Sequence, residues 1–212
     1  MGARRRGRRL RVYTDAAQSL GKIATKVEEL GVDLLSIAGH KAYAPKGVGA
    51  LYVRRGIEIE PLSHGTGHEG GRRAGTESAP LAAALGKACE LAQSWIGMPG
   101  VERLRDLFWE RLQAAFGDRV LLNGHPQRRL PNTLNVSFVG RVGAEILAQL
   151  PEVAASTGSA CHSGEIALSP VLNAMGVPAE IGIGAIRFSL GRGTTQADVE
   201  EVLHQLSRAL RT

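Results

Sequence analysis

The chain contains 212 residues, of which 43% are apolar and 22% are charged. This length allows one large domain or two small ones, and the apolar share is sufficient for a buried core. Because no run of about 18 apolar residues occurs, we expect no transmembrane helix and no membrane partner. Two cysteines, Cys89 and Cys161, make no disulfide framework, so a reducing, cytoplasmic setting is expected.

The net charge of +6 comes from the N-terminal segment. Residues 1–11 contain six arginines and no acidic residue, and the rest of the chain carries 20 basic and 20 acidic residues. Such an arm can contact nucleic-acid phosphates, but it also occurs as a solvated tail or as the end of a truncated helix. Because no aromatic residues are interleaved and no binding module is recognisable, we expect no nucleic-acid function.

The first predicted strand covers residues 12–14, and Asp15 follows it directly. Open α/β sheets place ligand contacts at the ends of strands, so Asp15 is suited to pair with a protonated ring nitrogen, with Gln18 donating a hydrogen bond nearby. The same aspartate would equally suit a cap of the next turn. Residues 26–30 predict a short helix that ends at Gly31.

The next strand, residues 33–38, leads into Gly39, His40 and Lys41, and a second apolar strand covers residues 50–53. A lysine at a strand end can be partly desolvated, with its amine aimed into a cleft. Only the neutral amine attacks a carbonyl, so this placement suits a Schiff-base lysine. A surface lysine on a hairpin loop has the same local sequence and stays open as an alternative.

Residues 64–76 are predicted to form a loop, because they include five glycines and have no periodicity. Backbone amides, two arginines and Thr76 in this loop are able to hold a phosphate. His64 and His68 have helical spacing, but the glycines between them exclude a stable helix. Without a further ligand at suitable spacing, we predict no metal site.

Pro80 opens a predicted helix that runs to about Trp95, and the glycine- and proline-rich run at 97–100 predicts a domain boundary. The second domain is predicted as α+β or α/β. Its expected elements are a helix from Val101, strands at 120–122 and 133–139, a helix at 144–150, a strand at 186–190 and a final helix capped by Thr195 and Asp198.

Two residues of the second domain are candidates for a role in catalysis or ligand binding. Cys161 lies in a run of small residues at 154–165, beside His162. A thiol in such a loop can be exposed and mobile, and a histidine can take its proton, although an ordinary loop cysteine fits as well. Arg187 interrupts an apolar strand, and a buried guanidinium there should pair with an acid or face a ligand carboxylate.

Taken in order from about Val12 to Leu210, these motifs resemble the cysteine desulfurases and selenocysteine lyases, which are pyridoxal-phosphate (PLP) enzymes of the class V aminotransferase group. The resemblance rests on the Asp-Ala-Ala-Gln-Ser, Gly-His-Lys, His-Gly-Thr-Gly-His-Glu, Gly-Ser-Ala-Cys and Ile-Arg-Phe-Ser-Leu-Gly-Arg runs. It implies an α/β fold: the C-terminal half of a fold type I large domain, followed by an α+β small domain.

The resemblance assigns cofactor contacts to five residues. It implies that Asp15 pairs with the pyridine nitrogen, that Gln18 contacts the phenolic oxygen and that His40 lies near the phosphate. Lys41 corresponds to the lysine that carries the cofactor as a Schiff base. Thr76 corresponds to the threonine that reaches the phosphate of a neighbouring subunit, which implies a homodimer.

The same resemblance assigns the substrate chemistry. Arg187 is implied to bind the substrate carboxylate, and Cys161 to take the sulfur of L-cysteine as a persulfide, leaving alanine. A sulfur-acceptor or scaffold protein, as in iron–sulfur cluster assembly, is an implied partner. L-selenocysteine as substrate and an inactive remnant both stay open, whereas an aminotransferase has no use for the thiol.

Two features depart from the family pattern. Many members have a serine or threonine two residues before the histidine, where this chain has Ala38; Ser36 or His40 are candidates to compensate. The family's chains are roughly twice as long, so we expect a truncated chain: residues 1–11 as a tail, 12–97 as the remainder of the large domain and 98–212 as the small domain. Since a sheet that lacks strands exposes its edge, we expect this chain alone to bind the cofactor weakly or not at all.

Overall fold

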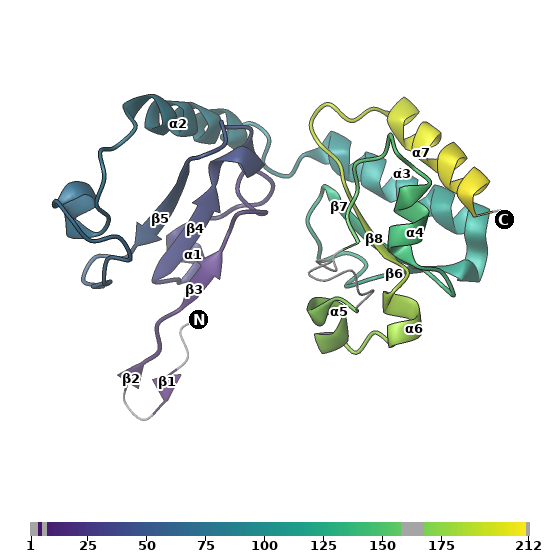
Figure 1. The fold of residues 1–212 in the computed structure, drawn as a ribbon, viewed down its shortest axis with the longest axis horizontal. Helices are drawn as coiled ribbons and strands as arrows, with labels where there is room; N and C mark the ends of the chain where they lie inside the picture. The colour runs from purple at the N-terminus through teal and green to yellow at the C-terminus, as the bar shows by residue number, and fades with distance from the viewer. Residues whose placement is uncertain (1–3, 6–7, 158–167, 211–212) are drawn as a thin grey trace. The chain divides into compact units, whose positions relative to one another are not determined.

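The computed structural model describes residues 4–5, 8–157 and 168–210. The chain forms two compact units, Met1–Gly97 (unit 1) and Met98–Thr212 (unit 2), which Figure 1 colours from purple to teal and from teal to yellow. In the part of the chain that the structure describes, no helix has the length and apolarity needed to cross a bilayer.

Unit 1 is built on a three-stranded sheet in the order β3-β4-β5. Its strands are β3 (Tyr13–Asp15), β4 (Leu34–Ala38) and β5 (Gly49–Val53). β3 runs parallel to β4, and β4 runs antiparallel to β5. Two short arginine strands, β1 (Arg4–Arg5) and β2 (Arg8–Arg9), pair antiparallel ahead of this sheet. The first predicted strand is therefore confirmed with a shift of one residue, and Asp15 is its last member.

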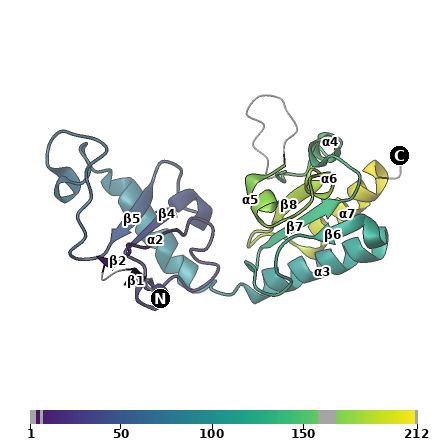
Figure 2. The same cartoon turned by 90° about the horizontal axis from the view of Figure 1, so that it is seen from below.

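The two helices predicted for unit 1 are confirmed as α1 (Val27–Leu30) and α2 (Ala79–Gln93). The 3-10 turns η1 (Gly39–Ala42) and η2 (His68–Gly71) were not predicted, and η2 lies in the segment that was predicted to be a loop. Gly31 ends α1 in the left-handed conformation, with φ of 65°, as expected for a glycine at that position. α2 packs along η1 at the end of β4, as Figures 1 and 2 show.

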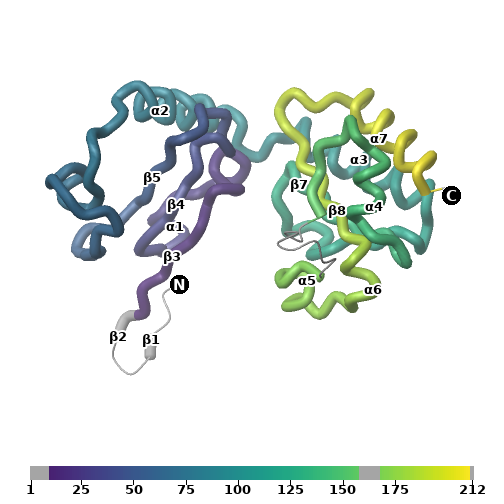
Figure 3. The backbone as a smooth tube through the Cα atoms, in the orientation of Figure 1, coloured from purple at the N-terminus to yellow at the C-terminus, as the bar shows by residue number. Residues whose placement is uncertain are grey.

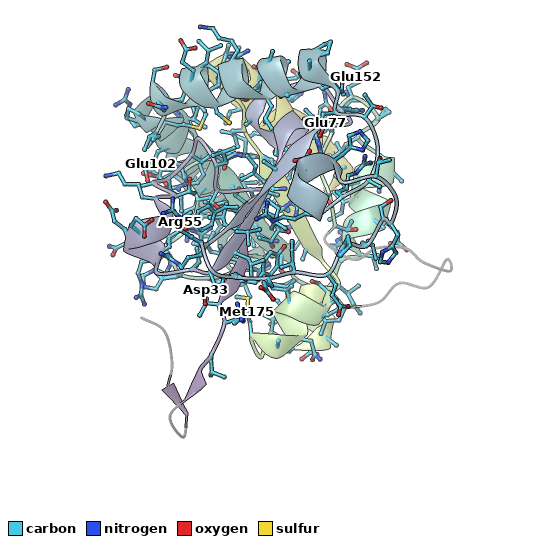
Figure 4. The ribbon with its side chains drawn as sticks, turned by 90° about the vertical axis from the view of Figure 1, so that its left-hand side faces the viewer. Asp33, Arg55, Glu77, Glu102, Glu152 and Met175 are labelled. Atoms are coloured by element: carbon cyan, nitrogen blue, oxygen red, sulfur yellow. The ribbon has the colours of Figure 1, made fainter. Side chains whose placement is uncertain are left out.

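The core of unit 1 is small. Ala16, Val32 and Leu35 form its buried cluster. Asp33, labelled in Figure 4, is only 1% exposed, and its Oδ2 accepts a hydrogen bond of 3.0 Å from the backbone N–H of Val12. This bond ties the entry of β3 to the start of β4, which fixes the parallel register of the two strands.

Unit 2 is a second three-stranded sheet, in the order β6-β7-β8, with all pairings antiparallel. Its elements are α3 (Pro99–Phe116), η3 (Gly117–Arg119), β6 (Val120–Leu122), β7 (Thr133–Phe138), α4 (Gly143–Ala148), α5 (Pro170–Ala174), α6 (Ala179–Gly182), β8 (Ala185–Ser189) and α7 (Gln196–Ala209). Figure 2 shows α3 on one side of this sheet and α4 and α5 on the other. The predicted strands and helices of this half are confirmed to within two residues.

Aromatic contacts join α3 to the sheet of unit 2. The rings of Phe108 and Phe188 lie 5.0 Å apart and those of Phe116 and Phe138 lie 5.7 Å apart, both in edge-to-face geometry. At the start of α7, Thr195 and Asp198 form the predicted capping box. Unit 2 therefore has a continuous core of its own between the helices and the sheet.

Candidate active site

Two of the predicted cofactor segments meet at one edge of the sheet in unit 1. β3 and β4 are parallel, with Asp15 opposite Ser36, and the backbone N–H of Ala16 donates to the carbonyl of Ser36 at 2.8 Å. Asp15 ends β3, and the turn that holds His40 and Lys41 follows the last residue of β4. The carboxyl ends of adjacent parallel strands are where α/β sheets bind ligands.

The carboxylate of Asp15 is exposed and already has one local partner. Its Oδ1 accepts a hydrogen bond of 2.9 Å from the backbone N–H of Ala17. This is the turn cap that the sequence left open as an alternative. A carboxylate accepts through both oxygens, so this cap is compatible with a ligand contact. Gln18 is exposed in the same turn.

The turn that carries Lys41 is tightly constrained. A Cβ on Gly39 would lie 2.8 Å from the carbonyl oxygen of Val48, so only glycine fits there without a backbone shift. The N–H of Ala44 donates to the carbonyl of Gly39 at 3.0 Å, and Tyr43 ends the turn with φ of 65°. His40 and Lys41 are both exposed, so the expected partial burial of Lys41 is wrong for this chain. The turn follows the end of β4, and none of the described elements of unit 1 covers the Lys41 side chain there.

Lys22 is a residue of this region that the sequence patterns missed. It is 9% exposed, and its Nζ donates to the backbone carbonyl of Lys41 at 3.3 Å. Burial, and then the charge of Lys41, lowers the pKa of Lys22 below its ordinary value. Hydropathy predicts that a lysine lies at the surface. The one signal in the sequence that could have linked Lys22 to this site is its closeness to Gln18.

Thr76 is exposed on the long segment between β5 and α2, whose path Figure 3 shows. Nearby, Glu77 accepts a hydrogen bond of 3.1 Å from the N–H of Glu69 (Glu77 is labelled in Figure 4). Hydrogen bonds from the backbone N–H groups of Glu77 and Glu69 hold the pKa of the Glu77 carboxyl below its ordinary value. The role predicted for Thr76 concerns a second subunit and stays a prediction.

Arg187 lies on β8 in unit 2, opposite Asn135 of β7. Its side chain is exposed, so the argument that burial demands an acidic partner is wrong: the strand has one solvated face at this position. On its other edge Arg187 pairs with Ser156. The N–H of Arg187 donates to the Ser156 carbonyl at 2.6 Å, and its carbonyl accepts from the Ser156 N–H at 3.2 Å. Ser156 belongs to the run of small residues at 154–165 that was predicted as the cysteine loop; Cys161 itself lies outside the described residues.

Within the residues that the structure describes, no group of three or more histidine, cysteine, aspartate or glutamate side chains is arranged to hold a metal ion. The site in unit 1 thus offers an exposed carboxylate, amide, imidazole and amine at one sheet edge. That donor set suits an organic cofactor with a cationic ring, a carbonyl and an anionic group.

Residues 1–202 match the family model for class-V aminotransferases. The chain belongs to this family, whose members depend on pyridoxal phosphate. It is 47% identical to Cysteine desulfurase 2 of Trichormus variabilis over 196 residues, covering 90% of this chain and 48% of the relative. It is also 47% identical to Cysteine desulfurase IscS of Dictyoglomus turgidum over 203 residues, covering 93% and 51%.

Solved structures give the same result for the fold. A NifS-like protein superposes with a TM-score of 0.83 at 34% identity, over 95% of this chain and 52% of that one. A NifS-like protein from Rickettsia africae superposes with a TM-score of 0.85 at 26% identity, over 95% and 54%. The fold is therefore the C-terminal half of a fold type I large domain followed by the small domain. The chain spans about half the length of the curated relatives it matches.

Proposed function

We propose that this chain supplies the lysine- and thiol-bearing half of a PLP-dependent cysteine desulfurase, which converts L-cysteine to alanine and a persulfide on Cys161. The observation that carries the proposal is the convergence of Asp15 and Lys41 at the common carboxyl edge of β3 and β4. Both belong to the motifs that the class-V family uses for its cofactor. The relatives at 47% identity support the choice of reaction within that family.

The residues present fit pyridoxal phosphate. Asp15 offers an exposed carboxylate for the protonated pyridine nitrogen, and Gln18 in the same turn would donate to the phenolic oxygen. Lys41 would hold the carbonyl carbon of the cofactor, with His40 beside it near the phosphate. When bound, the cofactor supplies an electron sink at the substrate carbon next to the amine.

The protein side chains have distinct tasks in this reaction. Arg187 would bind the substrate carboxylate through two parallel hydrogen bonds, since a guanidinium matches that group. The thiolate of Cys161 would form a bond to the substrate sulfur while the carbon–sulfur bond breaks. Lys41, once free, would move protons at the substrate carbons, so that alanine leaves. A cysteine thiol has an ordinary pKa of ~8.5, so a modest lowering of that pKa is enough to supply the thiolate for this role.

We further propose that the enzyme works as a cytoplasmic homodimer, with Thr76 reaching the phosphate bound by the partner subunit, and that the persulfide passes to an acceptor protein such as an iron–sulfur scaffold. Exposure of Thr76 is compatible with this task. L-selenocysteine is the alternative substrate, because the run Cys161-His162-Ser163 resembles that of selenocysteine lyases.

Sulfide release from L-cysteine in the presence of a thiol reductant tests the proposal. The 212-residue chain, supplied with pyridoxal phosphate, is compared with Cys161→Ala and with Cys89→Ala as the matched control. Sulfide from the unaltered chain and the control, with none from Cys161→Ala, supports the proposal. Absence of sulfide from all three favours a non-catalytic remnant. A parallel measurement of selenide from L-selenocysteine distinguishes the two substrates.

A further inference from the structure

Lys22 is a buried lysine that has no acidic partner among the described residues. Lysine is almost never buried unless it is paired, because removing an ammonium group from water is costly. Lys22 is nevertheless 9% exposed, and among the described residues its Nζ contacts no carboxylate. Its hydrogen-bond acceptor is the backbone carbonyl of Lys41, at 3.3 Å. An ion pair therefore does not explain why a lysine occupies this position.

The backbone around Lys22 is held firmly. The N–H of Lys22 donates to the carbonyl of Ser19 at 3.0 Å, and its carbonyl accepts from the N–H of Gly97 at 2.9 Å. The preceding Gly21 has φ of 73°, and a Cβ there would lie 2.8 Å from the Cβ of Ala92 in α2. Lys22 thus starts from a fixed point between the turn after β3 and the end of α2, and its side chain reaches across to η1.

The contact acts on the backbone that sets the direction of Lys41. The orientation of the Lys41 carbonyl is set by the ψ angle of Lys41, one of the two soft torsions of that residue. The N–H groups of Tyr43 and Ala44 close the turn by donating to the carbonyl of Gly39, which precedes Lys41 in the chain. Lys22 contacts the middle of the turn, through the carbonyl of Lys41.

We infer that Lys22 is a positioning residue: its buried amine holds the carbonyl of Lys41 and so fixes the turn from which the Lys41 side chain leaves the sheet. The inference deepens, and rests on, the proposed role of Lys41 as the cofactor-bearing lysine. Stability alone would favour an apolar side chain here. Burial and the neighbouring charge of Lys41 both lower the pKa of Lys22, which means that its charged form costs folding free energy.

The test compares Lys22→Met with Lys22→Arg and with Lys46→Met in the 212-residue chain. Lys46 is exposed and lies five residues after Lys41, so its replacement removes the same charge near the same turn without touching the contact. Two readouts are measured: amide hydrogen exchange of Tyr43 and Ala44, and the share of borohydride-trapped pyridoxal phosphate found on Lys41 by peptide mapping. Amide hydrogen exchange of Gly39, whose N–H donates to the carbonyl of Val48 at 2.9 Å, checks that the strands stay paired.

We expect Lys22→Met to raise exchange of the two turn amides by about tenfold, the size of one hydrogen bond from a charged donor. The share of label on Lys41 should fall while Gly39 keeps its protection. Lys22→Arg should restore part of both readouts, because arginine also donates from a cation, and Lys46→Met should change neither.

The inference is overturned if exchange of Tyr43 and Ala44 in Lys22→Met equals that of the unaltered chain, or if arginine and methionine behave alike. Failure of the proposed function has a different signature. In that case the unaltered chain traps no cofactor on Lys41, and the amide exchange still decides whether Lys22 holds the turn.

Discussion

The two units differ in how well each buries its own apolar surface. All four phenylalanines of the chain are buried in unit 2, together with fully buried aliphatic residues such as Leu112 and Leu206. Unit 1 buries mainly alanines with Val32, Leu35 and Leu85, while Leu51 on β5 is 47% exposed. The half that carries Lys41 is therefore the less stabilised half, and the half that carries Arg187 has a core able to hold its sheet rigid.

Truncating a buried ring in unit 2 tests this difference most strongly. Phe188→Ala removes the contact with Phe108 and leaves a cavity, so it should cost about 3–5 kcal/mol of unfolding free energy. Leu51→Ala, on the half-exposed strand of unit 1, should cost less than about 1 kcal/mol. Denaturant unfolding, followed by amide hydrogen exchange in each unit, measures the change in unfolding free energy of both variants. Similar costs for the two variants would contradict the comparison.

A smaller effect is expected at the turn of unit 1. In Gly39→Ala the added Cβ would meet the carbonyl oxygen of Val48, and relief requires a backbone shift that costs about 1–3 kcal/mol. Because this turn also carries Lys41, trapping of pyridoxal phosphate on Lys41 should fall in the same variant. Gly86→Ala serves as control, since a Cβ added to that helical glycine would have nothing within 4 Å. Unchanged stability and trapping in Gly39→Ala would show that the turn tolerates displacement.

The smallest effects are those of pH. In both units a lowered pKa makes stability rise with pH, but the two effects lie at opposite ends of the pH scale. In unit 2, hydrogen bonds from the backbone and then the hydroxyl of Thr195 lower the pKa of Asp198 below its ordinary 3.8. Stability from this carboxylate is present above pH 3.8 and is lost as the pH falls through the lower folded value. In unit 1, the lowered pKa of Lys22 means that stability rises as the pH approaches 10.5.

Unfolding measured across pH in Asp198→Asn and Lys22→Met checks these signs. We expect Asp198→Asn to flatten the acid side of the profile and Lys22→Met to flatten the alkaline side. If the slope of unfolding free energy against pH is unchanged in either variant, the replaced residue does not cause the pH dependence.

The sequence by itself determined the local features of this protein. The Thr195–Asp198 capping box, the helix end at Gly31 and the two strands around Lys41 depend on residues a few positions apart, and all are present in the structure. The family resemblance also followed from motif order, and the match over residues 1–202 bears it out.

Only the tertiary structure decided which of these features meet. The parallel pairing of β3 with β4, which brings Asp15 and Lys41 to one edge, depends on contacts such as that of Asp33 with Val12, 21 positions apart. The exposure of Arg187 and the burial of Lys22 reverse what local hydropathy predicts. Burial is set by what packs against a side chain from distant parts of the chain, and a local pattern carries no information about that neighbour.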